Sequence, residues 1–150
     1  MSFVYTPFKA KLLKGEIDFD APNDIRIALL KVKASTTADT DQDAEFVSSI
    51  TTLGELVATN YVRKALTGET VNQDDPNNRA EFDAGDVTFT ALGGATNDTI
   101  GAILLFKFVT NDADSPLIAY IDNAGADFSQ ATNGSDITIS WDIEGILQAT

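Results

Sequence analysis

The sequence TIGAILLFKFVT, residues Thr99 to Thr110, decides the fold of this chain. It is the most hydrophobic stretch of the 150 residues, and Lys107 is its one charged side chain. A continuous apolar run of this length predicts a central β-strand that is buried on both faces. It is shorter than the roughly 20 apolar residues that a membrane-spanning helix needs, so we expect no membrane span.

Two further apolar stretches predict strands before and after it. Ile25 to Val32 (IRIALLKV) places Ile25, Ile27 and Leu29 on one face. Pro116 to Asp122 (PLIAYID) begins with proline at the first strand position, where a missing N–H costs least. The intervening NDADS, residues 111–115, is typical of a turn.

Two other segments alternate apolar and polar residues, which indicates strands with one buried face. Asp86 to Leu92 (DVTFTAL) directs Val87, Phe89 and Ala91 to one side and ends at Gly93-Gly94, a turn. Asp136 to Ile143 (DITISWDI) does the same, and the shared face is made of Ile137, Ile139, Trp141 and Ile143.

The polar middle of the chain predicts shorter elements. Tyr61 to Leu66 and Glu69 to Gln73 are extended pieces around Thr67-Gly68, which suits a hairpin or a bulge. Asp74 to Asn78 (DDPNN) predicts a turn.

Helical signals are few. Pro7 and Gly15 bracket a short helix from Phe8 to Lys14, with Phe8, Leu12 and either Ala10 or Leu13 facing inward. Residues 34–45 contain almost nothing to bury and predict a surface loop that is mobile or an excursion. Phe46 to Val57 has helical spacing weakened by threonine and glycine, so we expect one or two helical turns that cap an open end of a sheet.

Together these signals predict a mainly β protein, an antiparallel β-sandwich or barrel with a short N-terminal helix and one or two short helical turns. The length fits a single domain over residues 1–150. Within it, residues 1–24 form an N-terminal helix or arm. Residues 25–150 form the β core, with a loop excursion at 33–58.

Composition excludes many functions. The chain has no Cys and no His, which removes thiol catalysis, zinc ribbons, disulfides and every His-dependent triad. Its net charge of −13, from 10 basic and 23 acidic residues, argues against nucleic acid and against an anionic membrane surface as partners.

The charge is unevenly distributed. Residues 1–33 hold six of the ten basic side chains, three of which are Lys9, Lys11 and Lys14. A mildly basic end on an acidic body suggests docking onto another acidic protein surface, such as a copy of the same chain. The simpler interpretation is a helix with solvated lysines.

Acidic turns are the candidate cation sites. Asp39, Asp41 and Asp43 resemble the start of a calcium loop, but Ala44 and Ile50 stand where an EF-hand needs Gly and Glu. Turn chemistry explains the remaining acidic clusters without an ion. These clusters are Asp74, Asp75, Asn77 and Asn78, and the pair Asp112 and Asp114.

Other candidate chemistry is weaker. Nineteen acids after residue 33 make some carboxylate pair inevitable, so a glycosidase signal has no specificity. Trp141 with Tyr120 could stack on a sugar, but Trp141 falls on the apolar face of its strand and is assigned to the core. Gly93-Gly94 lacks the lysine of a phosphate loop. We therefore assign no catalytic, cofactor or metal residue.

The order and spacing of DVTF (86–89), PLIAYID (116–122) and DITISWD (136–142) resemble a group of small virion proteins of tailed bacteriophages. Those chains similarly open with a short helix ending near a glycine, followed by a strand like Asp24 to Val32 and a segment like Tyr61 to Val71. The resemblance covers residues 8–147 and is poorest at 34–58.

The resemblance implies a non-enzymatic structural part of the virion, similar to capsid decoration or cement proteins and assembled in the host cytoplasm. Its partners would be the major capsid protein or other virion proteins, and a homo-oligomer, a trimer by preference, is expected. Residues 1–15 are predicted to make part of the contact, so that deleting them abolishes particle binding and leaves the β domain folded.

Two alternatives come from other classes of protein. One is a tail or head-fibre component that binds a receptor or a glycan through exposed aromatic residues such as Tyr61 or Phe128. The other is a carboxylate-dependent hydrolase, which no specific motif in the sequence supports.

Overall fold

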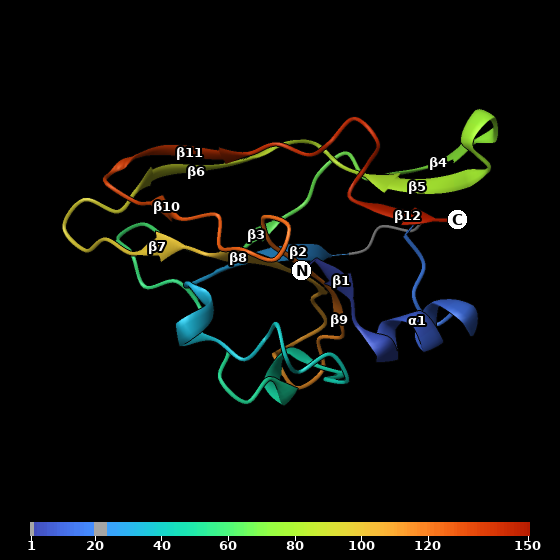
Figure 1. Cartoon of the computed structure of the whole chain (residues 1–150), viewed down its shortest axis with the longest axis horizontal. Helices are drawn as coiled ribbons and strands as arrows, with labels where there is room; N and C mark the ends of the chain where they lie inside the picture. The colour runs from blue at the N-terminus through green and yellow to red at the C-terminus, as the bar shows by residue number, and fades with distance from the viewer. Residues whose placement is uncertain (1, 20–23) are drawn as a thin grey trace.

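The protein is built on a five-stranded antiparallel sheet with the order β1-β9-β8-β2-β3 (Figure 1). The computed structural model describes residues 2–19 and 24–150. In chain order the strands of this sheet are β1 (Phe3–Val4), β2 (Ile25–Leu30), β3 (Lys64–Ala65), β8 (Ala102–Lys107) and β9 (Leu117–Ile121). The prediction of a mainly β, antiparallel fold is confirmed.

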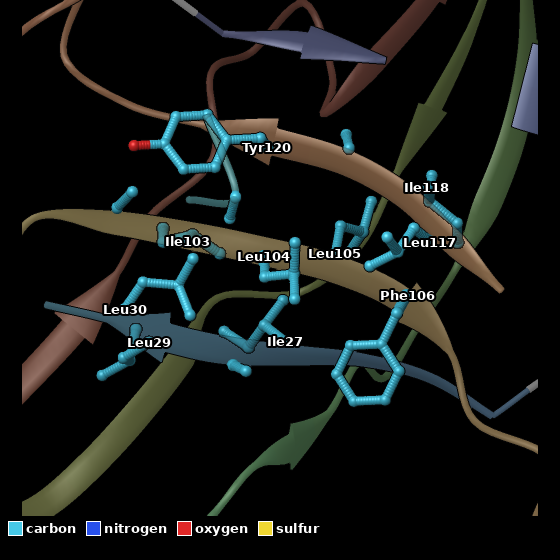
Figure 2. Close-up of a cluster of buried hydrophobic side chains, with 14 of the residues drawn as sticks. Ile27, Leu29, Leu30, Ile103, Leu104, Leu105, Phe106, Leu117, Ile118 and Tyr120 are labelled. Carbon is cyan, nitrogen blue, oxygen red and sulfur yellow. The ribbon is translucent and has the colours of Figure 1, made fainter. Parts of the chain in front are cut away.

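The centre of this sheet is β8, as its hydrophobicity predicts. Ile27 of β2 lies opposite Leu105, and Leu105 lies opposite Ala119 of β9. Figure 2 shows side chains from these three adjacent strands gathered into one apolar cluster. The five residues from Ala102 to Phe106 are all buried, because both faces of the sheet are covered.

The predicted central strand is broken at Gly101. Before it, β7 (Thr99–Ile100) pairs with β10 (Gln130–Ala131) instead of with the five-stranded sheet. A Cβ at Gly101 would lie 2.5 Å from the carbonyl oxygen of Lys31, so only glycine allows this close approach.

A second layer, the two-stranded ribbon of β6 (Val87–Leu92) and β11 (Ser135–Ile139), lies across one face of the central sheet (Figure 1). The predicted alternation holds at Val87 and Phe89, which are buried. The ribbon then bulges, since the register moves from Ile137↔Phe89 to Ser135↔Leu92. Leu92, rather than Ala91, is therefore the next fully buried residue, which corrects the prediction for Ala91.

Backbone geometry and one carboxylate account for the bulge. Ala91 has a φ of 48°, and its N–H donates to the Asp136 carboxylate at 2.8 Å. At the other end β11 stops at Ile139, and Ile143 is 95% exposed. The prediction that Ile143 shares the buried face is wrong because the strand does not extend that far.

A third sheet has the order β12-β5-β4, from β4 (Thr70–Asp74), β5 (Arg79–Asp83) and β12 (Leu147–Ala149). The predicted turn at 74–78 is confirmed and joins β4 to β5. The predicted hairpin around Thr67-Gly68 is wrong: β3 joins β2, and β4 joins β5. The sequence pattern missed β5 and β12 because they contribute few apolar side chains.

The N-terminal helix α1 (Thr6–Leu13) is confirmed, with Gly15 at a φ of +69° just beyond its end. Phe8 is buried and its ring contacts Phe19, which in turn contacts Phe82 of β5. Leu12, predicted to face inward, is 42% exposed.

The segment before and within α1 belongs to the core. β1 pairs with β9, and the hydroxyl of the fully buried Tyr5 donates to the Ala38 carbonyl at 3.0 Å. Deleting residues 1–15 would remove a strand, Tyr5 and Phe8 together. The expectation that this deletion leaves the β domain folded is therefore wrong.

Residues 33–58 lie along the face of the central sheet opposite the β6–β11 ribbon (Figure 1). A short 3₁₀ helix at Val47–Ser49 confirms one helical turn within Phe46 to Val57, although it covers a face of the sheet and not an end. A second 3₁₀ helix, at Lys33–Ser35, was not predicted. The expectation that 34–45 has almost nothing to bury is wrong, because Ala38 is fully buried and Ala44 is 7% exposed.

Two buried tyrosines under this segment provide a stability test. Tyr5 donates its hydroxyl to Ala38, whereas no hydrogen-bond partner for the Tyr120 hydroxyl lies in the described residues. We expect Tyr5→Phe to cost about 1–2 kcal/mol of unfolding free energy and Tyr120→Phe to be neutral or stabilising. Urea denaturation of both variants measures the difference, and equal losses would contradict this assignment.

Candidate functional site

Carboxylates in two of the acidic turns identified from the sequence accept hydrogen bonds from other residues of the chain. Asp41 accepts hydrogen bonds from the Thr37 hydroxyl at 2.7 Å and the Thr51 N–H at 2.9 Å, and these bonds lower the pKa of its carboxyl. Asp74 accepts from Asn77 and Arg79. Within residues 2–19 and 24–150, no cluster of three or more acidic side chains could hold a metal ion.

Arg63 makes the densest polar cluster, which sequence inspection missed. Its guanidinium donates to both oxygens of Glu55, at 2.9 and 2.8 Å, and to both oxygens of Asp112. The Tyr61 hydroxyl donates to Glu55 at 2.7 Å and accepts the Leu29 N–H at 3.0 Å. The cluster joins the 47–63 segment to the 110–115 turn, so its role is to fix two loops on the sheet.

The first candidate surface, the helix groove, lies between α1 and the β12-β5-β4 sheet, with a volume of about 570 Å³. Its lining is mostly apolar, and Leu13 is 89% exposed beside it. The lining residues that matter most are Leu12, Leu13, Phe19, Val71, Phe82 and Leu147. Apolar side chains that line an open groove make it a candidate site for a binding partner.

Charges of both signs flank the helix groove. Lys9 and Glu81 line it. Lys11 pairs with Glu45 at 2.9 Å and with Glu16 at 3.6 Å. Part of the basic character of the N-terminal segment is therefore neutralised within the chain. Lys9 is the helix lysine that the groove offers to a partner.

The second candidate surface, the β11 cleft, is an open hollow of about 660 Å³ between β11 and the central sheet. Its floor is apolar, from Ile100, Ile103 and Ile121, and its wall is residues 137–142. Asp122 also lines the cleft. Burial raises the pKa of its carboxyl, but hydrogen bonds and the Lys33 ammonium, which lies 3.0 Å away, lower that pKa to about 2. The Asp122 carboxylate is therefore ionised at neutral pH, and its charge is balanced by the Lys33 ammonium.

The aromatic residues considered as ligand-binding candidates occupy different environments in the structure. Tyr120 is fully buried and cannot stack on a ligand. Tyr61 packs its ring on Phe89 and is half-buried. Phe128, 38% exposed, and Trp141 both line the β11 cleft. Trp141 is half-buried, and its indole N–H donates to the Gly85 carbonyl at 3.2 Å. It packs against the hydrophobic core, as assigned from the sequence, and also forms part of the cleft wall.

Sequence inspection could have found only part of these surfaces. Two adjacent leucines in an eight-residue helix cannot both face the same core, which was a signal for the exposed Leu13. The sequence around residues 71, 82 and 147 does not indicate that these residues lie beside α1, because β5 and β12 were not predicted.

The described residues include no helix with the length and apolar character that crossing a membrane requires. No protein-family model matches this chain, and no curated protein matches it.

Proposed function

We propose that this protein is a non-enzymatic structural component of a tailed-bacteriophage particle, a decoration or cement protein that binds the head shell. The observation that carries the proposal is the helix groove, an apolar surface beside an 89%-exposed Leu13. Apolar surface of this kind is costly on a free monomer and becomes favourable once a partner covers it. The resemblance of the strand motifs to small virion proteins supports the same role.

The charge of the chain suits such a role. A net charge of −13 keeps the free protein soluble before assembly, when its apolar groove is uncovered. The absence of Cys makes the fold independent of the redox conditions inside and outside the cell. On the particle, the major capsid protein is the proposed partner, and a trimer is the proposed form because linked copies multiply modest contacts.

Counting copies of the chain in purified virions tests this function. Quantitative mass spectrometry and electron microscopy should find hundreds of copies on the head shell. Six or twelve copies at the neck or tail would overturn decoration in favour of another structural role. A chain missing from the particle would overturn the proposal altogether.

A substitution in the helix groove tests the proposed contact. We expect Leu13→Lys to fold normally, because the side chain is 89% exposed, and to lower particle occupancy at least about ten-fold by placing a charge in the apolar interface. Val62→Lys, at a valine that is 60% exposed outside the groove lining, is the matched control and should bind normally. Equal occupancy of both variants would place the contact elsewhere.

An alternative function, a fibre component that binds a receptor or a glycan, is favoured by the aromatic side chains of the β11 cleft. Phe128 and Trp141 both line it, and aromatic faces are common platforms for sugars. The isoleucine floor offers few hydrogen bonds to a sugar, which places this function second. A glycan array with no hits, together with localisation on the shell, would discard it.

A further inference from the structure

The β11 cleft combines an apolar bed with a free strand edge. Its floor consists of Ile100, Ile103 and Ile121, contributed by β7, β8 and β9. Its volume of about 660 Å³ is ample for several side chains. Ile100 and Ile103 are buried by the chain itself, at 1% and 3% exposure, so the half-buried Ile121 is the part of the floor that a partner can reach.

The wall of the cleft is the edge of a strand. Residues 137–142 line it, of which Ile137, Thr138 and Ile139 belong to β11 and the others follow the end of that strand. Since these three are consecutive in the strand, residues of both its faces border the hollow. A strand contributes residues of both faces to one cavity when its backbone edge points toward that cavity. Among the strands that the structure describes, β11 pairs with β6 alone. The edge of β11 away from β6 therefore offers ladder N–H and C=O groups beside the cleft.

We propose that the β11 cleft is a strand-addition site: an extended segment of a partner protein pairs with β11 and places alternate side chains against the half-buried apolar lining of Ile121, Ile137 and Trp141. Backbone hydrogen bonds supply affinity in this mode, and alternate side chains supply specificity. The occupant also covers the exposed strand edge, which is otherwise open to aggregation. This inference is independent of the function proposed above, which rests on the helix groove.

Charge selects among possible strands. Asp142 lines the cleft and is exposed, and none of the described lining residues is Lys or Arg. The carboxylate of Asp122, which also lines the cleft, is already paired with Lys33 at 3.0 Å. The occupant that fits is a strand with apolar side chains at alternate positions and Lys or Arg at its ends.

Trp141 is the one tryptophan of the chain and lines the cleft, so it reports binding directly. The probe is a nine-residue peptide in which valine alternates with lysine and threonine, capped at both termini. We expect saturable changes in Trp141 emission with a Kd below about 1 mM, and slowed amide exchange at alternate residues of 137–141.

Two control peptides separate strand addition from other binding. The same peptide N-methylated at every second amide cannot form the ladder and should bind at least about ten-fold more weakly. A peptide with glutamate in place of lysine should also bind more weakly, and the difference should shrink in high salt. Equal binding of the N-methylated peptide, absence of any change at 137–142, or saturable binding of a glycan at Trp141 in place of the peptide would overturn the proposal.

Matched protein variants complete the test. Asp142→Asn keeps an acceptor oxygen for the Glu144 N–H but removes a rim charge, and it should weaken the lysine peptide about three-fold. Asp43→Asn removes the same charge from the segment on the opposite face of the central sheet and should change nothing. If both variants bind the peptide alike, the charge selection assigned to the cleft is wrong.

Discussion

Gly54→Ala is expected to lower the free energy of unfolding by about 2–5 kcal/mol, as the sum of left-handed backbone strain and overpacking. Gly54 has a φ of +62° and belongs to the 33–58 segment. Its carbonyl accepts the Lys31 N–H at 2.8 Å. A Cβ there would collide with the carbonyl oxygen of Ser35 and lie 2.8 Å from the Thr36 Cβ, so the 33–58 segment would have to shift.

Gly15→Ala is the matched control for that substitution. Gly15 has nearly the same φ, +69°, but nothing lies within 4 Å of the added Cβ. It should therefore cost only the backbone strain, about 1–2 kcal/mol. Urea denaturation followed by circular dichroism measures both losses. Equal losses of unfolding free energy in the two variants would mean that the 33–58 segment can move to accommodate the added Cβ and is not tightly packed around Gly54.

Arg63→Met is expected to cost about 2 kcal/mol. The substitution leaves Glu55 and Asp112 without the guanidinium that joins them, and unpaired buried carboxylates are strongly destabilising. The cost stays below the roughly 3–5 kcal/mol of a fully buried pair, because the Asp112 side chain is 40% exposed and can rehydrate. Thermal and urea unfolding at pH 7 measure it.

Arg26→Met is the comparison for Arg63→Met. Arg26 pairs with Asp24, only two residues away, so this ion pair joins no distant loops. We expect its loss to cost under about 1 kcal/mol. If Arg26→Met proves as destabilising as Arg63→Met, the bridging role assigned to Arg63 is wrong.

The Arg63 cluster also predicts a pH dependence. Hydrogen bonds from Arg63 lower the pKa of Asp112 in the folded state. A lowered folded-state pKa stabilises the protein above the unfolded value, about 3.9 for Asp, and this contribution disappears as the pH falls through the folded-state pKa. The stability difference between wild type and Arg63→Met should therefore shrink below about pH 4. A difference that stays constant from pH 7 to pH 3 would contradict it.

Local sequence was enough to predict the central strands. The apolar runs at 25–32, 99–110 and 116–122 correspond to β2, β8 and β9, because strands that are covered on both faces carry continuous hydrophobicity. The alternation in β6 and β11 was equally visible, up to the bulge at Ala91. Glycine and proline marked the end of α1 and the β4–β5 turn, since they favour specific backbone angles.

Predictions failed for segments whose burial or strand pairing depends on contacts with distant parts of the chain. Ala38 and Ala44 are in a polar run, and they are buried only because residues 33–58 fold back over the central sheet. The assignment of residues 61–73 to one hairpin failed for the same reason: β3 and β4 found different partners in different sheets. Pairing energy is shared between strands, so neither strand encodes it alone.

The sequence by itself determined the β class, the central strands and the exclusion of thiol and histidine chemistry, because periodicity and composition are local properties. Only the tertiary structure decided the helix groove, the β11 cleft and the Arg63 cluster. Each joins residues far apart in the chain, such as Leu13 with Leu147 and Ile103 with Ile139. Their proximity follows from which strand edges pair and which stay open, and that choice is made by long-range packing.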